Sequence, residues 1–412
     1  MPHPEPASVP GVAPAAVTLP GLVAEELEAE LIAFRRDLHM HPELGNQEVR
    51  TTAVLKERLE RAGLVPRVLD SGTGLVCDIV PPNADPADET PMLALRADID
   101  ALPIPDTKTV PYRSTIPGRC HACGHDVHTT IVLGAGLVLA ELANTGRLTR
   151  PVRLIFQPAE EVLPGGANEA IAAGVLAGVG RILALHCDPK VEVGRLGVRT
   201  GAITSACDRI EISLAGPGGH TARPQLTTDL VTAAAKVATE VPALLSRRVD
   251  TRVGMAVTWG RITAGHAPNV IPQSAELSGT MRCLDLAAWR AAPDLVHAAV
   301  DEVAAMYRAK SELQYIRGVP PVVNDADSTA LLTRAMTLRC GAASVEPTEQ
   351  SLGGEDFSWY LEHVPGAMAR LGVRPPADAS PTPRDIHQGD FDVDERAIKV
   401  GVELLTAAAA LS

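Results

Sequence analysis

The segment of this sequence that offers most chemistry is Cys120–His128, which reads Cys-His-Ala-Cys-Gly-His-Asp-Val-His. Its two cysteines and three histidines supply five sulfur and nitrogen donors, which suit zinc and similar divalent metals. A structural zinc site normally has a second ligand pair, and the chain contains no other Cys-x-x-Cys. A thioredoxin-type redox pair is the other alternative, but the segment does not open a small βαβ unit. We therefore predict a metal site here, with one of the two cysteines merely packed.

Acidic side chains follow two of the predicted strands. Asp98 and Asp100 close an apolar strand, and because strand side chains alternate, their carboxylates point to the same side. Taken alone, a capping or solvated-loop role explains this pair equally well. Glu160 and Glu161 follow the apolar strand 152–156, and adjacent acids are usually just a solvated face. Consecutive extended residues point in opposite directions, however, so one glutamate could bind a metal while the other transfers a proton.

Two single histidines complete the set. His186 ends a predicted strand and His387 lies in Ile-His-Gln-Gly-Asp-Phe. A lone histidine is more often structural than a ligand, but the other donors favour a ligand role for both. Cysteine, histidine and glutamate together provide what two divalent metals need, including a bridging ligand and open positions for water. A free glutamate beside that water can take its proton and later protonate a leaving group.

The elements that must position these residues alternate between helix and strand in the first half of the chain. Apolar runs with turn signals between them predict a largely parallel α/β sheet, and ligands bind at the carboxyl ends of such strands. The predicted helices are 24–38, 49–62, 129–143 and 167–176, and the predicted strands are 75–80, 92–99, 152–156 and 181–186.

From about residue 208 the order becomes βαββαβ, which is typical of ferredoxin-like domains. We therefore predict a discontinuous α/β catalytic domain with an inserted ferredoxin-like α+β lid domain. The inserted strands are 209–214, 251–262, 274–283 and 312–316, with helices 228–245 and 286–306. Helix 328–339, strand 367–372 and a helix from residue 394 then complete the first domain. The predicted divisions are a Pro/Ala-rich extension 1–22, catalytic segments 23–206 and 318–412, and the lid 207–317.

Composition limits the classes of protein. A chain of 412 residues favours two or three domains, and a formal charge of −13 without a dense basic run disfavours a nucleic-acid or anionic-membrane surface. No stretch of eighteen apolar residues suggests a membrane span, and seven scattered cysteines do not form a disulfide framework. The start lacks the pattern of a signal peptide. These features predict a soluble, cytoplasmic protein.

Nine motifs in order resemble the aminoacylase/carboxypeptidase family of two-metal peptidases, most of all its amidohydrolase branch with hippurate hydrolase and the plant auxin–amino acid conjugate hydrolases. The resemblance extends from about residue 25 to the C-terminus. The motifs are RADIDALP (96–103), HACGHDVH (121–128), FQPAEE (156–161), ALH (184–186), GGHTARP (218–224), NVIP (269–272), GTMR (279–282), GEDF (354–357) and His387.

The resemblance implies a role for each matching residue. Glu160 matches the general base, and Asp100 matches the acid that orients a metal ligand or the base. The implied metal ligands are Cys123, which bridges the two ions, and His125, Glu161, His186 and His387. The roles of His128, Glu355 and Asp356, which also lie in matching motifs, are less defined.

The inserted domain of the family is a lid and usually a dimerisation surface. Its histidine, here His220, reaches the active site of the partner subunit and polarises the scissile carbonyl. Asn269 and Arg282 match positions near the substrate carboxylate. Gln225 departs from the family, where histidine is frequent, and Cys120 and the Pro-rich start lie outside the pattern.

We therefore predict an amidohydrolase that uses two divalent ions per subunit, of zinc, manganese, cobalt or nickel, to release a carboxylic acid and an amino acid from an N-acyl amino acid. The predicted assembly is a homodimer through the lid, or a larger oligomer built from such dimers. A dipeptidase or exopeptidase with the same residues is the nearer alternative. A non-catalytic protein with a structural zinc site at Cys120–His128 is the alternative from another class.

Overall fold

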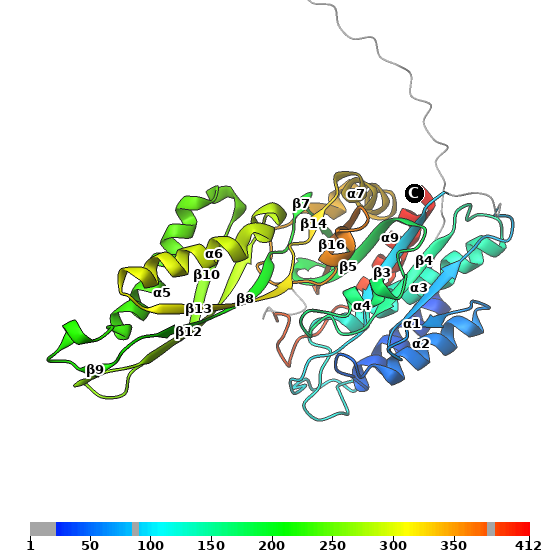
Figure 1. Ribbon diagram of the computed structural model, residues 1–412. Helices are drawn as coiled ribbons and strands as arrows, with labels where there is room; N and C mark the ends of the chain where they lie inside the picture. Colours follow the sequence, from blue (N-terminus) through cyan, green and yellow to red (C-terminus); the bar gives the residue numbers. More distant parts are fainter. Residues whose placement is uncertain (1–21, 85–89, 377–383) are drawn as a thin grey trace, which may run out of the picture.

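The computed structural model describes residues 22–84, 90–376 and 384–412. Apart from Leu22, the extension expected at residues 1–22 lies outside this part of the chain. The described residues form two bodies, each built on its own sheet (Figure 1).

The larger body is built on an eight-stranded sheet in the order β1-β2-β4-β3-β5-β16-β6-β15. Its four central strands, β4, β3, β5 and β16, are parallel to one another. The expectation of a largely parallel sheet is thus met in the centre, whereas β2 joins β4, and β6 joins β16, in antiparallel fashion. The strands are β1 (Arg67–Val68), β2 (Leu75–Ile79), β3 (Met92–Asp98), β4 (Val152–Gln157), β5 (Val179–Glu192), β6 (Leu196–Val198), β15 (Val345–Pro347) and β16 (Gly366–Arg374).

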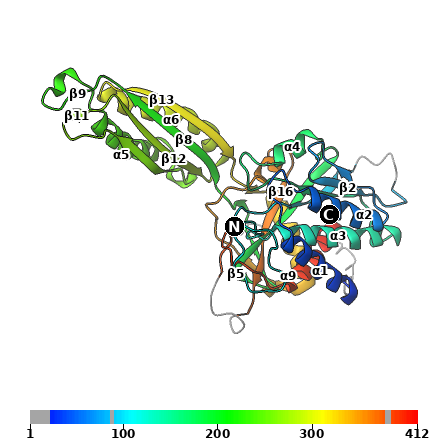
Figure 2. The same ribbon diagram turned by 90° about the horizontal axis from the view of Figure 1, so that it is seen from below.

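Both ends of the described chain fold onto this sheet (Figure 2). The helices are α1 (Glu25–Met40), α2 (Val49–Arg61), α3 (His125–Asn144), α4 (Ala167–Ala172), α7 (Ala326–Cys340), α8 (Ser358–Leu361) and α9 (Arg396–Leu411). The short strands β7 (Gly201–Ala202) and β14 (Val323–Asn324) pair with each other. The catalytic body is therefore discontinuous in sequence, as expected.

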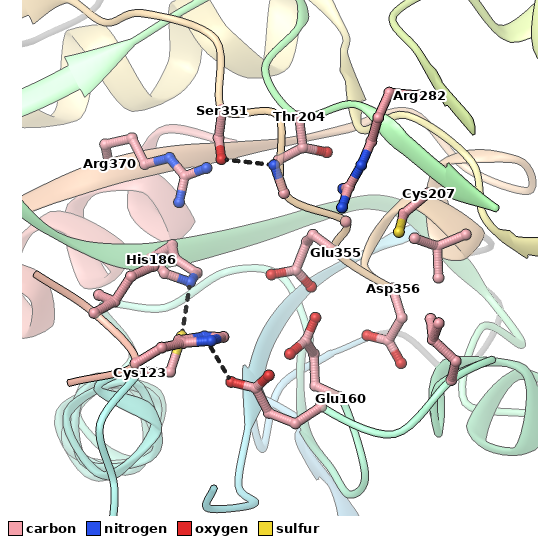
Figure 3. A pocket seen from close by; sticks show the side chains of 17 residues that line it. Cys123, Glu160, His186, Thr204, Cys207, Arg282, Ser351, Glu355, Asp356 and Arg370 are labelled. Carbon is pink, nitrogen blue, oxygen red and sulfur yellow. Dashed lines mark hydrogen bonds and ion pairs between the residues drawn. The ribbon is translucent and has the colours of Figure 1, made fainter. Parts of the chain in front are cut away.

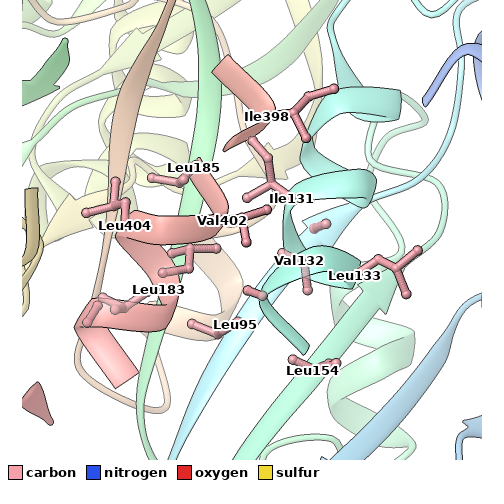
Figure 4. Packing of buried hydrophobic residues seen from close by; sticks show 14 of the residues in the cluster. Leu95, Ile131, Val132, Leu133, Leu154, Leu183, Leu185, Ile398, Val402 and Leu404 are labelled. Atoms are coloured by element: carbon pink, nitrogen blue, oxygen red, sulfur yellow. The ribbon is translucent and has the colours of Figure 1, made fainter. Parts of the chain in front are cut away.

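Helices α3 and α9 pack together over the sheet (Figure 4). Gly401 allows this close approach, because a Cβ there would lie 2.5 Å from Cδ1 of Ile131. Leu95 of β3 and Leu183 of β5 belong to the same buried cluster. Helix α3 has the length and apolarity of a membrane span, but 89% of its most apolar window is buried inside the protein. The first turn of this helix therefore emerges from a rigid core.

The smaller body is a four-stranded antiparallel sheet in the order β10-β12-β8-β13, packed against two helices. Its elements are β8 (Ala206–Ala215), α5 (Leu230–Arg248), β10 (Ala256–Ala264), β12 (Ser274–Cys283), α6 (Leu286–Met306) and β13 (Lys310–Val319). This is the expected βαββαβ order. The strand expected at 251–262 starts later, because 251–253 form a 3-10 helix that Asp250 caps. A separate apolar cluster fills this body, which we call the lid domain.

Candidate active site

The reactive side chains surround one cavity of about 320 Å³ at the carboxyl ends of the central strands, beside the lid domain (Figure 3). Asp98 ends β3, Gln157 ends β4, and the loop after Gln157 brings Glu160 and Glu161 to the cavity wall. His186 differs from expectation, because β5 continues to Glu192 and places this histidine inside the strand. The described lining residues are Cys123, Glu160, Glu161, Leu163, His186, Thr204, Cys207, Arg282, Val319, Ser351, Gly353, Gly354, Glu355, Asp356, Arg370, Ile386 and His387.

His125 is oriented by Asp100. The Nδ1 of His125 lies 3.0 Å from the backbone oxygen of Asp100 and 3.2 Å from its Oδ1, so this nitrogen carries the donated proton. Its Nε2 is then left as an acceptor, and it is buried without a hydrogen-bond partner among the described residues. Carboxylate oxygens of Asp98, Glu161 and Glu160 lie 3.8, 3.9 and 4.0 Å from Nε2. A free imidazole lone pair among carboxylates is the geometry of a metal ligand.

Cys123 and His186 face each other with 3.5 Å between Sγ and Nε2. His186 donates from Nδ1 to the backbone oxygen of Cys187 at 2.8 Å, which again leaves Nε2 as an acceptor. Burial raises the pKa of the Cys123 thiol well above its usual value. Burial, and after it the charge of Arg370, lowers the pKa of His186. A cation that binds here therefore meets a neutral imidazole and displaces a thiol proton.

Glu161 and His387 lie on the other side of Cys123. The Oε1 of Glu161 is 3.3 Å from Nε2 of His387, and its backbone nitrogen donates to Oδ2 of Asp100 at 3.0 Å. Burial works against ionisation of Glu161, but the hydrogen bond from His387 lowers its pKa. The backbone of His387 has a left-handed φ of 62° and donates to the oxygen of Ala122 at 2.7 Å. That bond ties the His387 loop to the segment that carries Cys123.

Glu160 has a different environment from its neighbour. Burial, followed by the charges of Glu355 and Glu161, raises the pKa of its carboxyl well above the usual value. Ala159, directly before it, has a left-handed φ of 57° and donates its backbone N–H to Oε1 of Glu48 at 2.7 Å. The loop is therefore held in a strained conformation that turns two consecutive glutamates to different partners, as a metal ligand and a base require.

The donors fit two divalent cations. Cys123, His125 and His186 offer ligand atoms within 4.8 Å of one another, and so do Cys123, Glu161 and His387. The two groups share the Cys123 sulfur, and the unpartnered Nε2 of His125 belongs to the first. Sulfur, imidazole and carboxylate donors in this number suit zinc, manganese, cobalt or nickel.

Three donors of the Cys120–His128 segment lie outside these groups. His128 donates from Nδ1 to Asp98 at 2.7 Å and accepts from the backbone nitrogen of Cys187 at 2.8 Å, so both of its nitrogens are occupied. Cys120 is buried and accepts from Nζ of Lys108 at 3.5 Å. His121 is buried and does not line the cavity. Cys120 is therefore the packed cysteine of the pair.

Sequence reasoning gave no role to Arg96, which organises the acids on one side of the cavity. Its guanidinium lies 2.7 Å from Asp98, 2.7 Å from Asp356 and 3.2 Å from Glu355, and it is fully buried. It also donates to Gln157 at 2.9 Å. An arginine two residues before Asp98 in an apolar strand was the available signal, because buried charges need partners.

The three lid residues named from the sequence lie in two places. Arg282, near the base of the lid domain, lines the cavity and donates to the backbone oxygen of Leu352 at 2.6 Å. His220 ends β9 (Gly219–His220) and Asn269 directly precedes β11 (Val270–Ile271), the two strands of a small sheet at the far end of the lid domain (Figures 1 and 2). Both are exposed and absent from the cavity lining. One chain does not bring them to its own cavity.

The fold and this cavity have close counterparts among known proteins. Residues 94–411 match the description "Peptidase family M20/M25/M40". An N-acetyl-L-cysteine deacetylase of Bacillus subtilis is 36% identical over 90% of this chain and 85% of its own length. The crystal structure of the YxeP protein of Bacillus subtilis, a dinuclear metal-binding peptidase of the M20 family, has a TM-score of 0.80 at 33% identity and covers 94% of this chain and 99% of that one.

A longer relative is also similar. A Rhodococcus jostii protein named putative glutamate–cysteine ligase 2-3 is 48% identical over 92% of this chain. The chain spans only 46% of that protein's length.

Proposed function

The chain belongs to peptidase family M20/M25/M40 and is a metal-dependent hydrolase, and from this premise we propose that it cleaves the amide bond of N-acyl amino acids. The products are a carboxylic acid and an amino acid. The observation that carries the proposal is Glu160, which lines the cavity with an oxygen within 4.8 Å of ligand atoms of His125 and Glu161, where a base can reach water between the metal ligands.

We propose that two ions would be held by Cys123, His125, Glu161, His186 and His387, with Cys123 as the residue common to both donor groups. When bound, divalent ions polarise the amide carbonyl and lower the pKa of water.

Glu160 then acts as the general base. It takes the proton of the attacking water and returns it to the leaving nitrogen. Asp100 fixes His125 in the tautomer that exposes Nε2, and its other oxygen holds the backbone of Glu161. Asp100 is therefore a positioning residue that orients both neighbours.

The lid domain supplies the remaining groups. Arg282, at the cavity, binds the carboxylate of the amino acid as a guanidinium suits that group. We propose that His220 and Asn269 act on the cavity of the partner subunit in a homodimer formed through the lid, because they are exposed at the far end of their own. His220 there stabilises the charge that develops on the carbonyl oxygen.

The two alternative functions do not agree equally well with these findings. Family membership removes the non-catalytic zinc protein, and Cys120 and His121 do not join Cys123 in a closed zinc site. A dipeptidase or exopeptidase has the same residues and differs only in the acyl group that it accepts. We further propose a cytoplasmic location, in accord with seven free cysteines.

The experiment that tests this function is a panel of N-acyl amino acids, with benzoyl-glycine and N-acetyl amino acids, beside matched dipeptides. Each divalent metal is added back to metal-free protein before the assay. We expect hydrolysis of the acylated compounds at higher kcat/KM than of the dipeptides. Faster cleavage of the dipeptides would favour the peptidase, and no cleavage with any metal would refute both.

Titration with a chelator is a second test of the proposed function. Activity should disappear while circular dichroism keeps the folded signal, because the apolar clusters and not the metals hold the fold.

A further inference from the structure

Arg370 is a charged residue inside an otherwise apolar strand. Every residue of β16 from Gly366 to Val373 is buried, and Arg370 is the one charged side chain among them. It is only 8% exposed. No ion pair or side-chain hydrogen bond joins its guanidinium to any residue of the described ranges. Because a buried charge without a counter-charge is costly, this position calls for an anionic partner.

The backbone directs Arg370 into the active-site cavity. Arg370 pairs with His186 across the parallel strands β16 and β5, so both side chains lie on the same face, and both line the cavity. On the other side of β16, Gly197 of β6 leaves room, because a Cβ there would lie 3.3 Å from Cβ of Arg370 and 2.9 Å from Cβ of Thr348. Arg370 also lines a second pocket, whose wall includes Asp188, Glu346 and Asp385, but none of these carboxylates is paired with it in the described part of the chain. A ligand in the active-site cavity can supply the missing counter-charge.

Arg96 is a buried arginine whose charge is neutralised by carboxylates of its own chain. Arg96 has three carboxylates within 3.2 Å, and two of them, on Glu355 and Asp356, line the same cavity. Arg370 has none, although the cavity wall contains four acidic side chains. The acids of the wall are directed to Arg96 and to the metal ligands, which leaves Arg370 free for a ligand.

We propose that Arg370 binds a second carboxylate of the substrate, on its acyl part, so that the preferred substrates are N-acyl amino acids with an acidic acyl group. This inference rests on the proposed amidohydrolase function. Arg370 and Arg282 lie on two sides of the cavity with Thr204 between them (Figure 3). With Arg282 on the carboxylate of the amino acid, a group that reaches Arg370 beside His186 belongs to the other end of the molecule. A guanidinium binds such a carboxylate through two parallel hydrogen bonds.

The test compares N-succinyl-leucine with its terminal-amide analogue, which has the same shape without the second charge. We expect the wild-type protein to prefer the succinyl compound by at least about tenfold in kcat/KM. Arg370→Met should bring that ratio to about one, and Arg370→Lys should keep part of it. Arg374→Met, on the same strand but away from the cavity lining, is the matched control and should keep the wild-type ratio.

Two results overturn the proposal. One is a wild-type ratio near one, and the other is an Arg370→Met ratio that stays at the wild-type value. The pair N-acetyl-glutamate and N-acetyl-glutamine tests on which side of the amide bond the second carboxylate is recognised. Arg370→Met could remove a preference for N-acetyl-glutamate over N-acetyl-glutamine but leave the preference for the succinyl compound unchanged. Arg370 would then bind a carboxylate on the amino-acid part of the substrate, and the proposal would be wrong. Should Arg370→Met fail to fold, the wild-type and Arg370→Lys ratios decide.

Calorimetry separates this inference from the proposed function. If no N-acyl amino acid is hydrolysed, the proposed function fails, and binding of the same two compounds to metal-loaded protein still decides the role of Arg370. Tighter binding of N-succinyl-leucine that depends on Arg370 supports the proposal, and equal binding of both compounds contradicts it.

Discussion

The cavity of the catalytic body and the far end of the lid domain both carry predicted site residues, but they hold them differently. Around the cavity, His125 and Asp98 are buried and linked to further buried groups such as Asp100 and Arg96. At the end of the lid, His220 is exposed on a pair of two-residue strands. Its ring accepts a local hydrogen bond from the backbone of Ala222 at 3.0 Å.

This difference indicates that the catalytic body and the lid domain contribute differently to the proposed reaction. Among the proposed metal ligands, His125, His186 and Glu161 are fixed in place before substrate arrives, because each is hydrogen-bonded to a buried partner. His220 and Asn269, unlike Arg282, lie away from the cavity of their own chain in the part that the structure describes. The proposed dimer therefore completes a site whose chemistry resides in the catalytic body.

Of the variants that test this comparison, Glu160→Gln is expected to have the largest effect on activity. It removes the proposed base from the cavity but leaves all five proposed ligands, so kcat should fall by about 10²–10⁴-fold with metal content unchanged. Steady-state kinetics and elemental analysis measure the two quantities. Glu169→Gln, on the exposed face of α4, is the control. Near-normal turnover of Glu160→Gln with both metals bound would show that another group is the base.

Arg96→Met tests the buried network itself. It leaves Asp98, Glu355 and Asp356 without their shared counter-charge, and we expect the free energy of unfolding to fall by about 3–5 kcal/mol. Arg36→Met is the control, because Arg36 is paired with Glu395 at a partly exposed position and its loss should cost at most about 1 kcal/mol. Denaturant unfolding of both variants measures the difference. Equal losses would mean that the network does not hold the cavity together.

His220→Ala tests the lid. We expect kcat to fall by about 10²–10³-fold, as for loss of one donor to the developing oxyanion, with metal content unchanged. His266→Ala, also exposed in the lid, is the control.

Mixed dimers decide whether the partner subunit supplies the histidine. Mixing His220→Ala with Glu160→Gln should restore activity, since one cavity of the mixed dimer then has an intact base and receives an intact His220. Two inactive variants that stay inactive after subunit exchange would contradict action across subunits.

The smallest expected effect is a pH dependence confined to the catalytic body. Burial and Arg35 disfavour the charged form of His39, but the carboxylates of Asp126 and Asp106 outweigh them and raise its pKa to about 9. The folded protein thus holds a proton that the unfolded chain releases near pH 6.5. Stability is full below about pH 6.5 and falls by up to about 3 kcal/mol as the pH rises through 9.

Hydrogen exchange of individual helices measures this effect. Protection of α1 and α3 should decrease from pH 6.5 to 9 after correction for intrinsic exchange, while that of α5 and α6 in the lid stays constant. His39→Gln should remove the pH dependence in α1 and α3. The same loss of protection in all four helices would mean that the two bodies do not differ.

The long elements could be predicted from the sequence because each repeats a pattern over many residues. Helix α6 and strand β12 have the predicted bounds, 286–306 and 274–283. Helix α3 begins at His125, four residues before its predicted start, since its first turn carries ligand and network side chains in place of an apolar pattern. The two-residue strands β9 and β11, which place His220, are too short for any periodicity.

The partners of buried charges could not be predicted in the same way. Arg96 meets Asp356 across 260 positions of the chain, and no local pattern links the two. Arg370 looked like one more residue of an apolar strand, because only the folded structure shows that it lacks a counter-charge. The roles of residues in known motifs were predicted from those motifs, whereas the structure alone reveals the carboxylate partners of Arg96 and the missing partner of Arg370.

The central claim is that Cys123 is a ligand of both divalent ions, because it belongs to both donor groups. Elemental analysis after reconstitution with zinc or manganese tests it most directly, on the wild-type protein, Cys123→Ser and the neighbouring Cys120→Ser. The account predicts two ions per chain for the wild type and for Cys120→Ser, and one or none for Cys123→Ser. Two ions retained by Cys123→Ser, or fewer than two in the wild type, would contradict it.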